Sequence, residues 1–202
     1  MSALPINPNE IAFLLIDFQE GITELSRTVE QASLRAAAIS LAKLARVFGV
    51  PTIVSTAMLE GPTLVTPEIE NALGNLGLSA PARTTSNAFT HIPTTDKIAS
   101  LGRKTLLVAG VLTEVAVQHS ALSGAERGYD VQVVVDACGG LSPRTEEAAF
   151  LRLTQSGVTL TSCASVAGQL MGDLIQSPTA GEAIKILFEI CQIGQSAGRR
   201  TR

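Results

Sequence analysis

Short apolar blocks alternate with amphipathic stretches along most of the chain. Residues 11–17, "IAFLLID", are apolar up to a final acid, the pattern of a strand covered on both faces. Residues 30–48 place apolar side chains at three- and four-residue spacing and stop at Gly49, which predicts a helix with a glycine end signal. The strand "VPTIVST" follows at once, with Pro51 tolerable at its first position.

The same cycle repeats toward the C-terminus. We predict helices around residues 66–76, 94–102, 113–128 and 144–157, and extended segments near residues 81–89, 104–110, 130–137 and 158–163. Strands that alternate with helices at this spacing form βαβ units, with helices on both faces of a parallel sheet. We therefore expect a three-layer α/β/α sandwich around a central, mainly parallel six-stranded sheet.

A chain of 202 residues fits one compact domain, which we place at residues 1–175. Residues 176–202 add a helix and a short basic tail. The helix has an apolar face made of Ile184, Ile186, Leu187, Ile190 and Cys191. This face is expected either to cover the core of the same domain or to contact a neighbouring subunit, so we expect a homo-oligomer.

Composition removes several classes of function. The net charge is −3 and 3% of residues are aromatic, with no basic stripe, so nucleic acid is not an expected partner. No apolar run reaches the roughly 18 residues of a membrane span, and "MSALPINPNE" lacks the pattern of a secretory signal. The three cysteines lack C-x-x-C spacing, which is typical of free thiols in a reducing compartment. We expect a cytoplasmic protein that binds a small molecule.

Neither a metal nor a dinucleotide cofactor is expected. The two histidines, His91 and His119, belong to no cluster with ligand-like spacing, although a carboxylate-only site for a hard cation stays open. A doubly wound sheet alone gives some weight to a dinucleotide-binding protein. However, "IDFQEGI" stands where a G-x-G-x-x-G would follow the first strand.

Candidate chemistry lies at the carboxyl ends of the strands, where open parallel sheets bind ligands. Four features of the sequence converge there: Asp17, residues 56–61, "RTTSNAF" and "GVLTEVAV". Asp17 ends an apolar strand, so its carboxylate should be poorly solvated, and a raised pKa would suit acid–base chemistry. A turn or helix-cap aspartate is the alternative interpretation.

The segment "GVLTEVAV" is typical of a strand-to-helix elbow that presents a nucleophile. Gly110 permits a tight turn, Thr113 is the expected N-cap, and residue 116 falls in the first helical turn. A thiol at this position would gain thiolate character from the helix dipole, and the nearby amides could receive an oxyanion. The residue is Ala116, however, and a capped helix packed on the sheet explains the same pattern.

Together, "LLIDFQ", "ARTTSNAF", "GVLTEVAV" and "ALSGAERGYDVQVVVDACGG" follow the order and spacing of the isochorismatase-like cysteine hydrolases. The chain most closely resembles the YcaC-like branch, from about residue 8 to residue 172. The resemblance implies an aspartate that takes the thiol proton, a lysine that supports the charge and a cysteine that attacks. These positions map onto Asp17, Arg83 and Ala116.

Two of the three positions depart from the family pattern. Arg83 stays charged, so it could stabilise an anion and keep Asp17 ionised but could not shuttle a proton; a solvent-facing loop arginine is the alternative. The methyl group of Ala116 cannot attack, which excludes covalent catalysis of the family type in this chain. Of the other cysteines only Cys138 could approach the crevice, and an inert buried thiol is the expected interpretation.

The resemblance also implies a non-proline cis peptide between Val111 and Leu112. This bond would aim the amides of Leu112 and Ala116 at one point, as oxyanion donors. Some relatives bind zinc through histidines near the second and third strands, but residues 54–64 contain none, so that site is not expected. Instead, the expected pocket lining is Phe18, Met58, Leu59, Asn87, Phe89 and Leu112, with Asn87 either binding a substrate amide or carboxylate or shaping its loop.

The resemblance implies hydrolysis of a C–N bond in a small amide, carbamoyl compound or imide; vinyl ether hydrolysis is the less favoured reaction. Two explanations of Ala116 remain. In the first, which we favour, the natural residue is cysteine and this chain is an inactive variant, because the surrounding motif keeps its family form. In the second, alanine is natural and the protein is a binder or an oligomeric scaffold. Relatives of the YcaC type imply a tetramer or octamer.

Overall fold

Six strands form one parallel sheet in the computed structural model, which describes the backbone of residues 6–58 and 66–198. The strands are β1 (Ile11–Ile16), β2 (Thr52–Ser55), β3 (Gly77–Ser79), β4 (Thr105–Val111), β5 (Asp130–Gly139) and β6 (Thr159–Thr161). Their order is β3-β2-β1-β4-β5-β6, so the chain changes direction across the sheet between β1 and β4. Ligands of open parallel sheets bind at such a point.

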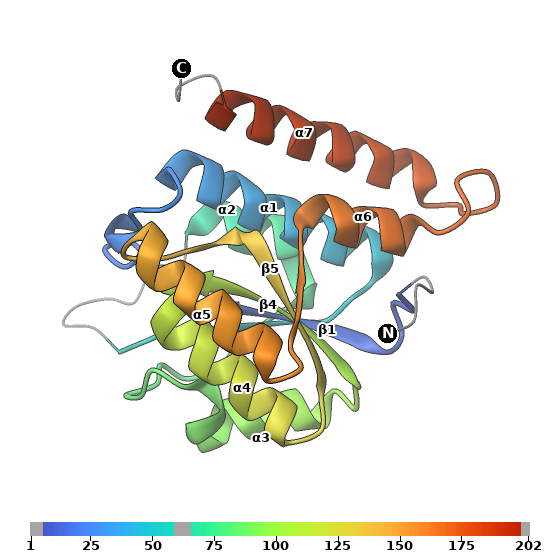
Figure 1. The fold of residues 1–202 in the computed structure, drawn as a ribbon. Coiled ribbons are helices and arrows are strands. Elements are labelled where there is room, and N and C mark those ends of the chain that lie inside the picture. The colour runs from blue at the N-terminus through green and yellow to red at the C-terminus, as the bar shows by residue number, and fades with distance from the viewer. Residues whose placement is uncertain (1–5, 59–65, 199–202) are drawn as a thin grey trace.

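Helices cover both faces of the sheet, which confirms the three-layer α/β/α prediction (Figure 1). They are α1 (Gln31–Phe48), α2 (Pro67–Leu73), α3 (Ile92–Ser100), α4 (Gln118–Glu126), α5 (Pro143–Gln155), α6 (Cys163–Met171) and α7 (Ala180–Gly198), with short turns η1 (Thr23–Leu25), η2 (Gly74–Leu76), η3 (Ala88–Thr90) and η4 (Thr113–Val117). Helices α1, α2 and α6 pack on one face, and α3, α4 and α5 on the other. No described helix combines the length and the apolar character needed to cross a bilayer.

β1 lies in the middle of the sheet, and all six of its residues are buried. Successive side chains of a strand point to opposite faces, so Phe13 and Leu15 join the core beneath α1, whereas Leu14 and Ile16 join the core beneath α4. Burial on both faces explains why this strand is continuously apolar rather than alternating.

The two central strands approach closely at their carboxyl ends. Ile16 of β1 is the register partner of Gly110 of β4. Gly110 has φ of +153°, and a Cβ atom there would lie 2.2 Å from the carbonyl oxygen of Ile16. Only glycine permits this approach. It brings the segments that follow β1 and β4 side by side.

One expected segment and one expected helix cap are wrong. The third strand is Gly77–Ser79, whereas we expected an extended segment at residues 81–89; only an isolated bridge between Ala57 and Arg83 continues the pairing there. The helix expected at residues 113–128 opens with the π-helical turn η4. Thr113 is not its N-cap, because the cap position is Leu112 and the Thr113 hydroxyl donates to Glu146 Oε1 at 2.7 Å.

Helix α7 lies across the outer side of α1 and α6 (Figure 1). Ile186 and Ile190 are buried in the core beneath it, whereas Cys191 is exposed and does not help to cover that core. The opposite side of the helix exposes Phe188, with 65% of its surface accessible. One face of α7 thus covers the home core while the other faces outward.

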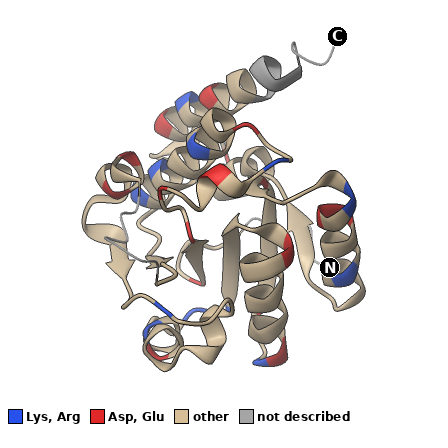
Figure 2. Ribbon diagram, turned by 90° about the vertical axis from the view of Figure 1, so that its left-hand side faces the viewer, with Lys and Arg blue, Asp and Glu red and all other residues tan. Residues whose placement is uncertain are grey.

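Most charged residues lie on the helices and loops around the sheet, with the two signs interspersed (Figure 2), and β5 carries Asp130 and Asp136. β1, β2 and β4 contain no charged residue. Any charge at the carboxyl ends of these three strands therefore comes from other segments, such as the loop after β3 that carries Arg83.

Candidate active site

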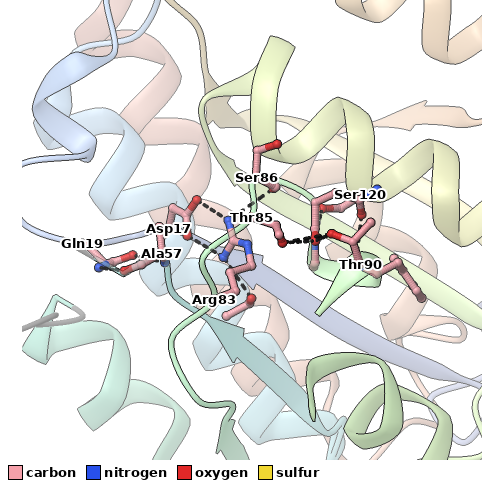
Figure 3. Close-up of polar contacts among 12 residues, drawn as sticks. Asp17, Gln19, Ala57, Arg83, Thr85, Ser86, Thr90 and Ser120 are labelled. Carbon is pink, nitrogen blue, oxygen red and sulfur yellow. Dashed lines mark hydrogen bonds and ion pairs between the residues drawn. The ribbon is translucent and has the colours of Figure 1, made fainter. Parts of the chain in front are cut away.

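Asp17 and Arg83 form a buried ion pair at the carboxyl edge of the sheet. Asp17 directly follows β1, with φ of +56° and 4% of its surface exposed, and Arg83 is 1% exposed. Arg83 Nη1 donates to Asp17 Oδ1 at 2.7 Å, and Nη2 donates to Asp17 Oδ2. Figure 3 shows the guanidinium and the carboxylate facing each other. Both carboxylate oxygens are therefore engaged by one cation.

The surroundings of Arg83 remove the alternative of a solvent-facing arginine. Nη1 also donates to Ser55 Oγ at 3.0 Å. Nη2 lies 3.5 Å from the carbonyl oxygen of Ser86 (Figure 3). The Arg83 backbone amide donates to the Thr56 carbonyl at 2.9 Å, and its carbonyl accepts from the Met58 amide at 2.8 Å. The arginine is held from both its side chain and its main chain.

Burial raises the pKa of the Asp17 carboxyl above its ordinary 3.8. The hydrogen bonds from Arg83, its positive charge and the Ala57 amide all act in the opposite direction. The direction agrees with the prediction for an acid at the end of an apolar strand, because desolvation disfavours the charged form. Burial and the bound guanidinium therefore act on the pKa of this carboxyl in opposite directions, and burial has the larger effect.

Gln19 connects the segment after β1 to the segment after β2. Its side chain is fully buried. Its Nε2 donates to the Ala57 carbonyl at 3.1 Å, and its Oε1 accepts from the Ala57 amide at 2.7 Å (Figure 3). We did not predict this role of Gln19. Its position two residues after Asp17, in "DFQ", places it at the same strand end and could have indicated a part in the site. Ser55, the last residue of β2, was missed in the same way.

The elbow after β4 contains a cis peptide bond between Val111 and Leu112, as the family resemblance implied. The Leu112 carbonyl then accepts from the amides of Val115 at 3.1 Å and Val117 at 3.3 Å. Ala116 lies within this turn and is 3% exposed. The residue at the expected nucleophile position thus sits at the start of a helix, next to the cis bond.

Glu114 braces the elbow against the segment before α5. Its Oε1 accepts from the Leu141 amide at 3.0 Å and from Thr145 Oγ1 at 2.6 Å. Gly140 permits this contact, because a Cβ atom there would lie 2.8 Å from Glu114 Oε2. With the bond from Thr113 to Glu146, the turn is attached to the next βα unit at two points.

One cavity of about 310 Å³ brings the three motif positions together. Asp17, Arg83 and Ala116 all line it. The other lining residues come from the segment after β1, the segment after β2, the Arg83 loop and the elbow: Ile22, Leu25, Ala57, Met58, Thr84, Thr85, Ser86, Val111, Leu112 and Val115. The spatial arrangement is the one that the motif mapping requires, and Met58 and Leu112 line the cavity as expected.

Three residues expected in the lining lie elsewhere. Phe18 is 2% exposed and packs in the core beneath α1, while Phe89 is 3% exposed and packs in the opposite core. Asn87 caps η3: its Oδ1 accepts from the Phe89 amide at 2.9 Å, and its Nδ2 donates to Ser123 Oγ at 2.9 Å. Asn87 therefore shapes its loop, which was the alternative interpretation. Leu59 lies outside the described residues.

The described cysteines offer no substitute nucleophile in the cavity. Cys138, on β5 beside Gly110, is fully buried, and burial raises the pKa of its thiol to about 12. Burial likewise raises the pKa of Cys163 well above 9.0. Cys191 is exposed on α7, away from the cavity-lining residues. Within the described residues, no three His, Cys, Asp or Glu side chains converge as a metal site would require.

The chain resembles characterised sequences and solved structures over most of its length. The family model for the isochorismatase domain matches residues 11–165. A probable hydrolase, YcaC of Escherichia coli, is 34% identical over 170 residues, covering 83% of this chain and 81% of the relative. Isochorismatase domain-containing protein 2 of Rattus norvegicus is 30% identical over 188 residues, which cover 91% of this chain and 84% of the relative.

Two solved structures share the whole fold. YcaC from Pseudomonas aeruginosa, with hexane-2,5-diol and covalent acrylamide, superimposes with a TM-score of 0.85 at 29% identity, covering 98% of this chain and 99% of the other. The Escherichia coli YcaC gene product, described as an octameric hydrolase of unknown specificity, superimposes with a TM-score of 0.84 at 29% identity. This match covers 100% of this chain and 98% of the other. The sequence motifs, the shared fold and the family match agree, and the chain belongs to the isochorismatase family of hydrolases.

Proposed function

We propose that the cavity is a hydrolase site for the C–N bond of a small amide, carbamoyl compound or imide, with alanine at the nucleophile position. The observation that carries this proposal is the convergence of Asp17, Arg83 and Ala116 on one cavity of about 310 Å³. The Pseudomonas aeruginosa relative holds a covalent acrylamide, which is itself an amide. Because Ala116 cannot form a covalent bond to substrate, the chain as given binds without turnover.

In a cysteine-bearing form the described groups have distinct roles. Asp17 would accept the thiol proton, and the thiolate would attack the substrate carbonyl carbon. The amides of Leu112 and Ala116 would donate to the resulting oxyanion. When the oxyanion collapses, the C–N bond breaks, the nitrogen takes the proton from Asp17 and leaves as ammonia or an amine, and water then hydrolyses the thioester to free the cysteine. Arg83 donates one hydrogen bond to each oxygen of Asp17, so each oxygen keeps a lone pair that could take the proton. Arg83 then stabilises charge and transfers no proton.

A second candidate is a non-catalytic small-molecule binder. The bidentate ion pair favours it, because a carboxylate with both oxygens occupied is a weaker base than one held by a single lysine ammonium. Reading codon 116 in the source gene separates the two candidates: a cysteine codon supports the hydrolase, and an alanine codon supports the binder.

The direct test restores the nucleophile with Ala116→Cys. The variant is incubated with a panel of small amides and carbamoyl compounds, and release of ammonia or amine is measured. Intact mass is compared with that of the unaltered chain, so that any adduct on its three native cysteines is subtracted. A combined Ala116→Cys and Asp17→Asn variant is the matched control and should lose both turnover and the extra adduct. No turnover and no extra adduct across the panel would support the binder.

We further propose a cytoplasmic homo-oligomer, a tetramer or an octamer. The Escherichia coli relative is described as octameric. The outward side of α7 exposes Phe188, and Ile175 before this helix is 95% exposed, so apolar surface is available for a subunit contact. Light scattering coupled to size-exclusion chromatography measures the assembly, and a monomeric mass would refute this proposal.

A further inference from the structure

Among the described residues, one positive and one negative group line the cavity, and their charges cancel. Of its described lining residues, only Asp17 and Arg83 carry charge. They are joined as a bidentate pair, with the arginine side chain fully buried and the aspartate side chain 6% exposed. The strands beneath, β1, β2 and β4, add no charge. The remaining lining is apolar side chains and three small hydroxyl residues, Thr84, Thr85 and Ser86.

The guanidinium has no accessible edge to offer an anionic ligand, because both terminal nitrogens are engaged and the third nitrogen is buried. Nη1 donates to Asp17 and Ser55, and Nη2 donates to Asp17 and the Ser86 carbonyl. The remaining nitrogen, Nε, is buried without a hydrogen-bond partner in the described structure. A ligand carboxylate would have to displace Asp17 from Arg83 to form its own bidentate pair. It would otherwise lie close to the Asp17 carboxylate, which repels it.

A carboxylate loses its hydration on entering a small, mostly apolar cavity, and this loss needs a compensating cation. An amide of the same size loses less, and it both donates and accepts hydrogen bonds. We infer that this cavity selects uncharged carbonyl compounds and rejects ligands that bear a carboxylate. The inference rests on the proposed function and narrows its substrate class: simple amides and carbamoyl compounds fit, whereas their carboxylated analogues do not.

The test measures binding to the chain as it stands, where Ala116 prevents turnover. Isosteric pairs of three sizes are titrated at pH 7.5 and followed by ligand-observed NMR: propionamide and propionate, isobutyramide and isobutyrate, and benzamide and benzoate. In at least one pair we expect the amide to bind ten-fold or more tightly than the carboxylate. Equal or tighter carboxylate binding would overturn the inference, and so would the absence of binding by all six compounds.

Two variants change the charge of the cavity. Asp17→Asn removes the negative charge and leaves Arg83 uncompensated, so the preference for the amide should fall at least ten-fold. Met58→Lys adds a positive charge at the cavity mouth, where Met58 is 60% exposed, without touching the ion pair, and should shift the preference in the same direction. Glu189→Gln on α7 removes one negative charge outside the cavity and should change nothing.

The outcomes separate this inference from the proposed function. If neither Asp17→Asn nor Met58→Lys alters the preference, cavity charge does not set it and the inference is wrong. An Ala116→Cys variant that turns over nothing, together with amide-selective binding to the unaltered chain, would refute the hydrolase proposal alone. Turnover of N-carbamoylglycine, which bears a carboxylate, at the rate of an uncharged carbamoyl compound would refute this inference alone.

Discussion

Gly110→Ala tests whether close approach of β1 and β4 holds the site together. The added Cβ atom would lie 2.2 Å from the Ile16 carbonyl oxygen and 2.9 Å from two further Ile16 atoms. Real Cβ atoms essentially never come within 3.0 Å of another heavy atom, so the strands must separate by roughly 0.8 Å at this point. The obstacle is backbone in the two central strands, and it cannot rotate away as a side chain could.

The cost has two parts. Overpacking of a well-packed interior destabilises by about 1–3 kcal/mol. The positive φ of Gly110 adds about 1–3 kcal/mol for a residue with a Cβ atom. We therefore expect the free energy of unfolding to fall by about 3 kcal/mol or more, a large part of the roughly 5–15 kcal/mol that stabilises most domains.

Urea unfolding followed by circular dichroism, at one protein concentration, measures this loss. With a denaturant slope of about 2–3 kcal/mol/M, the midpoint should fall by about 1 M or more. The matched control is Gly168→Ala in α6, where a Cβ atom meets nothing within 4 Å and the substitution should stabilise by about 0.5–1 kcal/mol. A loss below about 1 kcal/mol for Gly110→Ala would refute the close-approach argument.

Three further predictions concern charge, thiols and the elbow. Arg83→Met leaves the Asp17 carboxyl buried without its cation and should cost about 3–5 kcal/mol. Because burial raises the pKa of folded Asp17, this group stabilises the fold most below pH 3.8, and that stabilisation is lost as the pH rises. The loss of unfolding free energy caused by Arg83→Met, measured in urea, should therefore be larger at pH 8 than at pH 5. Iodoacetamide at pH 8 should alkylate the exposed Cys191 but not Cys138, whose pKa is about 12; a second adduct in intact mass before unfolding would contradict this. Glu114→Ala should lower the free energy of unfolding by about 1–2 kcal/mol. Glu114→Gln should lower it by less than half of that, because glutamine keeps the side-chain oxygen that accepts from the Leu141 amide and the Thr145 hydroxyl. Equal losses for the two variants in thermal unfolding would argue against the bracing role of Glu114.

The site itself was only partly predictable. Asp17, Arg83 and Ala116 were placed together because each follows a strand of a parallel sheet, and the carboxyl ends of such strands share one edge. Phe18, Asn87 and Phe89 were misplaced, because neighbours in sequence of a site residue can point away from it. Phe18 is in the core and Asn87 caps a turn, which depends on side-chain packing that no local pattern encodes.

The sequence alone determined the layered architecture, since continuous apolar strands and three- to four-residue helical spacing follow from local hydrophobic pattern. It also determined that residue 116 carries no nucleophile. Only the tertiary structure decided that Arg83 engages both oxygens of Asp17 and is fully buried, and that Gln19 bridges two strand ends. The first contact joins residues that are 66 positions apart in the chain, and the second joins residues that are 38 positions apart. Their geometry depends on how the whole sheet brings its strand ends together.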